Sequence, residues 1–256
     1  MPPLDQDLAQ LGLRHTADTL DDLMAHAAKR RLSHTQLLEY IAAIELEDRA
    51  RRSLERRMSR ARLGRFKPVA DFDWSWPSRV DRDAVDAVLR LDFLDSAGNV
   101  VLVAPQGLGK TTLAKNIGHN AVLAGYSVLF LTAAEMLLDL SGQESARGLE
   151  RRLRHYARPA LLVVDEIGYL SYDSRNSDLL FQVVSRRYEH KSVVLTTNLA
   201  FSDWPTIFPN ATSATALIDR LVHHAEVIAL EGDSYRRREA QSEKKARRRT
   251  RSKSCG

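Results

Sequence analysis

From about residue 98 to residue 230, short apolar runs alternate with longer segments in which apolar residues recur every three or four positions. The short runs predict β-strands and the longer spacing predicts helices. We predict strands at 99–104, 127–132, 160–164, 192–197 and 226–230, and helices near 110–124, 133–158, 176–190 and 214–224. Strands built almost entirely of Val and Leu, each followed by a helix, are typical of a parallel sheet covered on both faces. We therefore expect a three-layer α/β fold around a central parallel five-stranded sheet.

The N-terminal part of the chain has only the helical pattern. Residues 16–31 predict a short helix with Leu20, Leu23, Met24 and Ala27 on one side and Thr16 or Asp18 as its cap. After a break at Leu32, Ser33 and Gln36 have the spacing of a capping box that opens a long helix, Arg-rich through Arg62. Two helices joined by a turn suit a helix-turn-helix that reads DNA bases, and equally a helical adaptor that binds a protein or the DNA backbone.

Residues 64–80, with Gly64, Pro68 and the run Trp74-Ser75-Trp76-Pro77, interrupt the helical pattern and predict a linker. Tryptophans here can edge a nucleotide pocket, although tryptophans beside prolines are more often packing anchors. We expect three parts: a small N-terminal helical domain that binds DNA or a partner (1–67), an ATPase domain (68–235) and a disordered basic tail (236–256).

Charge is distributed unevenly along the 256 residues, and this bears on partners. Residues 29–67 hold 12 Lys/Arg against 5 Asp/Glu, and residues 236–256 hold 10 against 2, whereas the whole chain carries only +5. Basic segments at both ends of a mildly acidic body favour a polyphosphate partner such as duplex DNA. A tail of this kind can also serve only for solubility.

Several classes of protein are disfavoured. No run of about eighteen apolar residues occurs, and the first residues lack the order of a secretory signal, so we expect a cytoplasmic protein without a membrane partner. The single cysteine, Cys255, can form no intrachain disulfide and is a poor start for a metal site.

A glycine-rich segment, Ala104-Pro105-Gln106-Gly107-Leu108-Gly109-Lys110-Thr111, directly follows a predicted strand and opens a predicted helix. Phosphate-binding loops need this context, because glycines let backbone amides approach phosphates and the helix N-terminus adds a positive dipole end. We expect Lys110 to contact the β and γ phosphates and the Thr111 hydroxyl to bind Mg²⁺. The motif's first glycine is replaced by Ala104, which would strain the loop if this position required a positive φ.

Two further strands end in polar residues. Leu161–Val164 is followed by Asp165 and Glu166, and Ser192–Thr197 by Asn198. An acid at the end of a buried strand is costly unless it meets a cation, so Asp165 is the expected Mg²⁺ ligand, directly or through water. Glu166 is the expected general base for the attacking water, and Asn198 the residue that senses the γ phosphate.

Arg220 and the pair His223-His224 lie near the end of the last predicted helix. Arg220 can act as an arginine finger toward a neighbouring subunit, or form an intrachain salt bridge. The two histidines have no Cys or other His at metal-ligand spacing, so packing or hydrogen bonding is favoured over metal binding.

Several residue combinations are more specific than the loop alone: Asp165-Glu166-Ile167-Gly168-Tyr169-Leu170, Arg187-Tyr188-Glu189, Thr197-Asn198-Leu199, Asp219-Arg220-Leu221-Val222-His223-His224 and Ser234-Tyr235-Arg236. Over roughly residues 33–238 the chain resembles the IstB-like ATP-binding proteins, helpers of insertion-sequence transposases, and is also similar to bacterial helicase loaders. The resemblance implies a P-loop NTPase of the AAA+ class that forms a homo-oligomer on duplex DNA and presents a target site to its cognate transposase.

The same resemblance assigns residues to roles. It makes Arg220 the inter-subunit arginine and puts Arg236 near the nucleotide, while Ala104 and Thr112 depart from the family pattern of Gly and His. The expected ATP-binding residues are Pro105, Gln106, Gly107, Leu108, Gly109, Lys110, Thr111, Thr112, Asp165 and Arg236; the catalytic set is Glu166, Lys110, Asn198 and Arg220; and Thr111 and Asp165 hold Mg²⁺. Alternatives are a helicase loader or replication initiator, and a DNA-binding scaffold that binds ATP but hydrolyses little.

Overall fold

The computed structural model describes residues 3–169, 172–209, 211–232 and 235, so that Arg236 and the predicted tail lie outside the described residues. The chain separates into two compact units, Met1–Arg56 and Arg57–Gly256. The helices are α1 Leu4–Gln10, α2 Arg14–Asp18, α3 Leu20–Arg30, α4 His34–Ala61, α5 Arg82–Arg90, α6 Lys110–Leu123, α7 Ala133–Ser141, α8 Ala146–Ala157, α9 Ser174–Arg187 and α10 Ala211–Val222, with short 3-10 turns at Val69–Asp71, Asp92–Leu94 and Phe201–Thr206. The strands are β1 Arg79–Val80, β2 Asn99–Val103, β3 Val128–Thr132, β4 Leu161–Ile167, β5 Ser192–Thr197 and β6 Ala225–Glu231.

A mostly parallel sheet forms the centre of the larger unit, in the order β1-β6-β2-β5-β4-β3. The five predicted strands are all present and all parallel to their neighbours. The sheet has a sixth strand that the sequence did not predict, because β1 is only two residues long and pairs antiparallel with the edge strand β6. The strand order places β2 beside β5 and β5 beside β4, which brings the ends of three strands to one edge.

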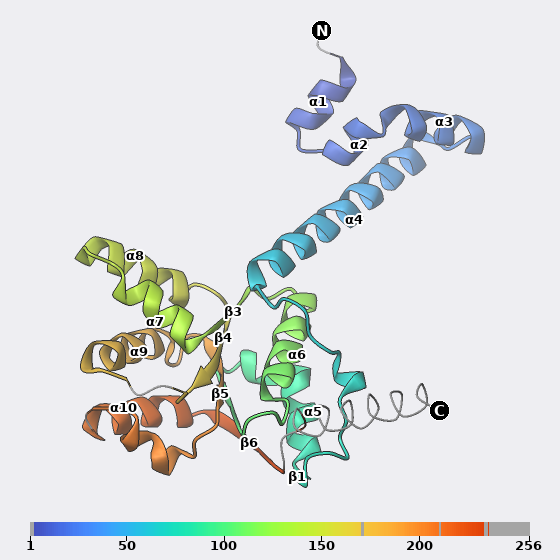
Figure 1. The fold of residues 1–256 in the computed structure, drawn as a ribbon. Helices are drawn as coiled ribbons and strands as arrows, with labels where there is room; N and C mark the ends of the chain where they lie inside the picture. Colours follow the sequence, from blue (N-terminus) through green and yellow to red (C-terminus); the bar gives the residue numbers. More distant parts are fainter. Residues whose placement is uncertain (1–2, 170–171, 210, 233–234, 236–256) are drawn as a thin grey trace, which may run out of the picture. The chain divides into compact units, whose positions relative to one another are not determined.

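Helices cover both faces of this sheet, as expected for strands that are apolar on both sides (Figure 1). One face packs against α7, α8, α9 and α10 through a core that includes Val101, Leu162, Leu195 and the fully buried Trp204. On the other face, Gly118 of α6 lies against Val128 and Val163 of the sheet. The expected three-layer α/β architecture is therefore confirmed.

One predicted helix, 133–158, is wrong as a single element. The structure divides it into α7 and α8 around Gly142–Ser145. Ser145 begins the second helix by accepting a hydrogen bond from the Gly148 amide at 3.0 Å. A capping serine just after a glycine ends one helix and starts the next, although the apolar spacing continues across the break.

The smaller unit contains α1, α2, α3 and most of α4, and one predicted helix there is also wrong. Residues 16–31 are divided between α2 and α3, and Thr19 interrupts them with its hydroxyl donating to the His15 carbonyl at 2.7 Å. Neither Thr16 nor Asp18 is the N-cap of either helix. The predicted capping box is confirmed: the Ser33 amide donates to Gln36 Oε1 at 2.8 Å and the Gln36 amide donates to Ser33 Oγ at 3.2 Å.

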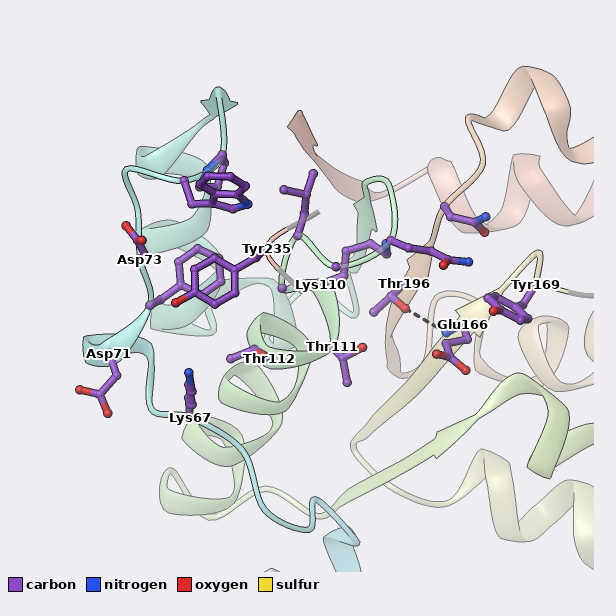
Figure 2. A pocket seen from close by; sticks show the side chains of 18 residues that line it. Lys67, Asp71, Asp73, Lys110, Thr111, Thr112, Glu166, Tyr169, Thr196 and Tyr235 are labelled. Atoms are coloured by element: carbon purple, nitrogen blue, oxygen red, sulfur yellow. Dashed lines mark hydrogen bonds between the residues drawn. The ribbon is translucent and has the colours of Figure 1, made fainter. Parts of the chain in front are cut away.

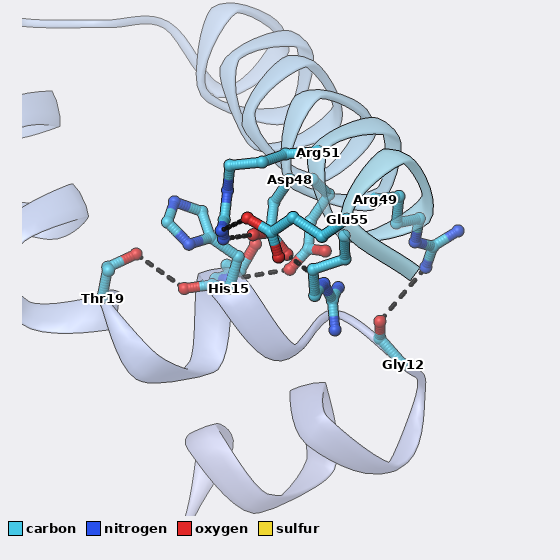
Figure 3. A network of polar contacts seen from close by, with 10 residues as sticks. Gly12, His15, Thr19, Asp48, Arg49, Arg51 and Glu55 are labelled. Carbon is cyan, nitrogen blue, oxygen red and sulfur yellow. Dashed lines mark hydrogen bonds and ion pairs between the residues drawn. The ribbon is translucent and has the colours of Figure 1, made fainter. Parts of the chain in front are cut away.

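Some of the basic residues of α4 are already paired within the smaller unit (Figure 3). Asp48 forms ion pairs with Arg51 and with Arg52, the latter at 2.6 Å, and Arg49 donates to the Gly12 carbonyl at 3.2 Å. Part of the positive charge counted in residues 29–67 is therefore used within this unit: the Asp48 ion pairs lie within α4, and the Arg49 contact joins α4 to the turn after α1. None of the helices described combines the length and the apolar character needed to cross a membrane.

A buried arginine holds the far end of the sheet. The Arg187 side chain is fully buried, and its guanidinium donates to the carbonyl oxygens of Tyr156, Ala157, Pro159, Ala160 and Ser192. Burial lowers the pKa of Arg187 to about 9, so the group remains cationic at neutral pH. The cation thus joins the end of α8 to the starts of β4 and β5.

Replacing Arg187 with Met is expected to lower the free energy of unfolding by about 3 kcal/mol or more, because five carbonyl groups, two of them in buried hydrogen bonds, lose the guanidinium as a donor. Arg186→Met is the matched control, since Arg186 only pairs with Glu150 at the surface and its loss is expected to cost under about 1 kcal/mol. Urea unfolding followed by tryptophan fluorescence measures both, because Trp74, Trp76 and Trp204 all lie in the larger unit. Equal stability of the two variants would contradict this role of Arg187.

Candidate nucleotide-binding site

The loop between β2 and α6 has the backbone that its glycines permit. Gly107 and Gly109 adopt left-handed conformations, with φ of 82° and 89°. Ala104 does not adopt a positive φ and is only 2% exposed, so the residue that replaces the motif's first glycine fits without backbone strain. Lys110, the first residue of α6, turns its ammonium back over the loop and donates to the carbonyls of Ala104 and Pro105, the latter at 2.9 Å. The replacement of glycine by Ala104 is therefore not expected to distort the phosphate-binding loop.

The two acids at the end of β4 are set by a β-bulge. Val164 pairs with Leu195 and Ile167 with Thr197, so β4 carries one residue more than β5 over this stretch. Within the bulge Glu166 adopts a left-handed φ of 64°, a conformation that costs a side-chain-bearing residue about 1 kcal/mol. Strained backbone of this kind is often found at functional sites.

The bulge gives the two carboxylates different surroundings. Asp165 is 4% exposed and accepts hydrogen bonds from the hydroxyls of Thr111, at 3.0 and 3.1 Å, and Thr196, at 2.5 Å. Glu166 has an exposed side chain, while its backbone amide donates to Thr196 Oγ1 at 2.9 Å (Figure 2). Thr196 therefore contacts both acidic residues and holds the bulge in place.

These elements open onto a pocket of about 360 Å³ (Figure 2). Among the predicted site residues, its lining includes Gln106, Gly107, Leu108, Gly109, Lys110, Thr111, Thr112, Glu166 and Asn198. Asp165 does not line the pocket but lies directly behind Thr111 through their hydrogen bonds. The glycine-rich loop and the strand-end acids therefore lie together, as the sequence predicts.

Three further predicted site residues do not appear in the pocket lining. Two of them lie outside the pocket, and the third lies outside the residues that the structure describes. Pro105 contributes its carbonyl to Lys110 but does not line the pocket. Arg220 is half-buried on α10, where its guanidinium lies 4.4 Å from the centroid of the Phe181 ring and donates to the Ala216 carbonyl at 3.3 Å. It does not line the pocket of its own chain. Arg236 lies outside the described residues.

One wall of the pocket was missed by sequence reasoning. It comes from the segment predicted as a linker and from Tyr235, and includes Lys67, Phe72 and Trp76. Tyr235 is fixed by its amide, which donates to the Gly107 carbonyl at 3.1 Å, and its ring lies 6.0 Å from that of Trp76. The two tryptophans differ: Trp76 lines the pocket, whereas Trp74 packs on Phe72 and under Arg82. The preference for packing over a pocket edge was therefore correct for Trp74 and wrong for Trp76.

Phe72 is pressed against the phosphate-loop backbone. A Cβ atom added at Gly109 would lie 2.5 Å from Phe72 Cε2, so only glycine leaves room for the ring. The aromatic wall and the loop are thus packed directly together. A flat apolar surface of this kind suits a nucleotide base, while the adjoining loop suits phosphates.

The donor set also fits a hard divalent cation. The Thr111 hydroxyl and the Asp165 carboxylate lie within hydrogen-bond distance at the start of α6, and oxygen ligands of this type suit Mg²⁺. A carboxylate buried to this extent is stabilised when a cation approaches it. The residues present are therefore compatible with a magnesium–nucleotide complex.

Comparisons with known proteins agree with this geometry. The family model described as "IstB-like ATP binding protein" matches residues 6–243. The chain is 35% identical to an ATP-binding protein of insertion sequence IS21 from Pseudomonas aeruginosa, with 93% of this chain and 90% of that protein covered. It is 34% identical to the corresponding protein of insertion sequence IS5376 from Geobacillus stearothermophilus, with 90% and 92% covered.

Among solved structures, that of DnaI superposes with a TM-score of 0.53 at 16% identity, covering 64% of this chain and 90% of that chain. At this level of identity the similarity concerns the fold, which is the expected AAA+ P-loop fold. The family match extends over nearly the whole chain and includes the loop, the strand-end acids and the aromatic wall. The chain therefore belongs to the family of IstB-like ATP binding proteins.

Proposed function

We propose that this protein hydrolyses ATP and uses the nucleotide state to control its assembly on duplex DNA, where it assists the transposase of an insertion sequence. One observation carries the hydrolytic part: Lys110, the Thr111–Asp165 pair and Glu166 meet at a single pocket. The relatives named for insertion sequences IS21 and IS5376 support the biological setting. Duplex DNA and a cognate transposase are accordingly the proposed partners.

In this proposal each polar residue of the pocket has a separate task. The amides of Gly107–Lys110 and the Lys110 ammonium bind phosphate oxygens, and Thr111 and Asp165 would hold Mg²⁺. The bound Mg²⁺ would neutralise charge on the phosphate oxygens. Glu166, exposed on its strained bulge, accepts a proton from the attacking water, and Asn198 orients that water or contacts the γ phosphate.

In this proposal Arg220 contacts the nucleotide that is bound by a neighbouring subunit. It does not line its own pocket and is held on α10 against Phe181, which suits a side chain that acts across an interface. ATP would then link adjacent subunits, and the protein would form a homo-oligomer. The intrachain alternative is a purely structural role; in place of the salt bridge considered from the sequence, Arg220 contacts the Phe181 ring and the Ala216 carbonyl.

Arg220→Ala is expected to raise the protein concentration needed for ATP-dependent assembly on duplex DNA by roughly tenfold or more, because about 1.4 kcal/mol of contact is lost at each interface. Binding of ATP by the single chain should be unchanged. Arg154→Ala is the matched control, since Arg154 is an exposed helical arginine paired only with Glu150. Sedimentation with duplex and a non-hydrolysable ATP analogue measures assembly, and equal assembly of the two variants would contradict the assignment.

The basic segments support DNA as the ligand. Even with Arg49, Arg51 and Arg52 engaged within the smaller unit, residues 29–67 and 236–256 retain a strong excess of positive charge. A helicase loader is the second candidate, which the sequence resemblance leaves open; the similarity to DnaI, at 16% identity, concerns only the fold. A gene for an integrase-type transposase beside this one supports the first function, and its absence the second.

The direct test is sedimentation of the full chain with duplex DNA, with and without the ATP analogue. We expect assembly that requires nucleotide and weakens as salt concentration rises, because phosphate contacts release counterions. Assembly that is the same with and without nucleotide would contradict the proposed coupling.

A further inference from the structure

A cluster of potential metal ligands lies apart from the nucleotide pocket. Glu189, His223 and His224 each offer one ligand atom, and these atoms all lie within 4.8 Å of one another. None of the three lines the nucleotide pocket. The two histidines lie in the turn directly after α10 and the glutamate in the turn after α9, and these turns are 34 residues or more apart in the sequence. That separation explains why the local spacing around the histidines did not predict a metal site.

The backbone that carries the two histidines is fixed by one buried residue. The Asn99 side chain, 7% exposed, accepts from the Val193 amide at 3.0 Å and donates to the Leu221 carbonyl at 3.1 Å. The Asn99 amide also donates to the His224 carbonyl at 2.7 Å. Asn99 therefore ties the end of α10 and the His224 backbone to the start of β5, so the turn that carries the two histidines is held before any ion arrives.

One of the three ligands, His223, is held by a neighbouring side chain. Tyr188 hydroxyl lies 2.7 Å from His223 Nδ1 and its ring stacks on that imidazole, which leaves His223 Nε2 for an ion. A hydrogen bond on the other ring nitrogen is the usual partner of a metal-binding histidine. Glu189 adopts a left-handed φ of 58°, at a cost of about 1 kcal/mol for a residue with a side chain. All three ligands are exposed and reachable from solvent.

We propose that Glu189, His223 and His224 form a binding site for a divalent transition-metal ion, Zn²⁺ in particular. Two imidazoles and one carboxylate are a ligand set that Zn²⁺ accepts, with a fourth position open to water or to another molecule. Tetrahedral ligands lie about 3.4 Å apart around Zn²⁺, so the exposed side chains need to close by about 1 Å or somewhat more. The ion would join the end of α10, the helix that carries Arg220, to the turn after α9.

Titration calorimetry of the untagged full chain with Zn²⁺, in reducing buffer and excess Mg²⁺, tests the site. We expect one Zn²⁺ per chain, bound roughly tenfold or more weakly by His224→Ala and by Glu189→Gln. His190→Ala is the matched control, because His190 is exposed beside Glu189 but is not one of the three ligands, and it should bind Zn²⁺ as the wild type does. Co²⁺ in place of Zn²⁺ should give visible absorption that is lost in the same two variants.

Three results would overturn the site: no Zn²⁺ binding by the wild-type chain, binding that survives in both ligand variants, or equal loss in His190→Ala. A thermal melt of each variant shows whether it is folded, and the wild-type titration decides the question even if a variant is not. ATP binding should be the same with and without Zn²⁺, so failure of this site leaves the proposed ATPase function untouched.

Discussion

Replacing Glu166 with Gln is expected to lower the rate of ATP hydrolysis by about 10³-fold while leaving ATP affinity unchanged. Gln has nearly the same shape but cannot accept a proton from water. The bulge should survive, because the Thr196 hydroxyl contacts the Glu166 backbone amide and not its side chain. Phosphate release measures the rate on the DNA-bound protein, and calorimetry with a non-hydrolysable analogue measures affinity.

The matched control for this variant is Glu231→Gln. Glu231 is also an exposed glutamate at the end of a strand, but its carboxylate lies 3.8 Å from Arg79 and it does not line the pocket. We expect wild-type hydrolysis from this control. Equal rates in the wild type and Glu166→Gln would exclude Glu166 as the general base.

Lys110→Ala is expected to weaken ATP binding by about 10³-fold, because two charge-assisted hydrogen bonds to phosphate, each worth about 2 kcal/mol, would be lost. The Lys110 ammonium contacts the loop carbonyls of Ala104 and Pro105, so it already lies over the loop. Lys115→Ala provides the control on the same helix. Lys115 lies over the Phe130 ring, 4.8 Å from its centroid, and is not part of the pocket lining.

Calorimetric titration of both lysine variants with the ATP analogue gives the comparison. Lys115→Ala should bind as tightly as the wild type. If Lys110→Ala did so as well, the glycine-rich loop would not be the phosphate site.

The fold could be predicted largely from the sequence because the signals are long and repeated. Strands β2, β3, β4 and β5 are apolar runs in which nearly every residue is buried, and a fully buried strand needs such a run whatever surrounds it. Strand β6 fully buries only Ile228 and Leu230. Two features with weaker sequence signals were not predicted. Strand β1 has two residues, and the separation of α7 from α8 depends on one capping hydrogen bond of Ser145.

The phosphate side of the site could be predicted for a similar reason. The loop, Asp165, Glu166 and Asn198 all lie at the carboxyl ends of adjacent strands, and parallel topology brings such ends together. The bulge at Glu166 had no signal in the sequence, because a single extra residue in one strand is defined by its partner's register.

The aromatic side could not be predicted because its parts are far apart in the sequence. Trp76 comes from a segment rich in Pro and Gly that indicates a linker, and Tyr235 follows β6. Tertiary contacts bring them to the loop, among them the Tyr235–Gly107 hydrogen bond and the packing of Phe72 on Gly109. The cluster of Glu189 with the two histidines was missed for the same reason.

The most direct test is equilibrium titration of the wild-type full chain with ATP and Mg²⁺, with and without duplex DNA. We expect one nucleotide bound per chain, with an affinity that falls when Mg²⁺ is removed, because Asp165 and Thr111 would lose the ion they hold. Absence of ATP binding in every one of these conditions would contradict the assignment of this pocket to the nucleotide.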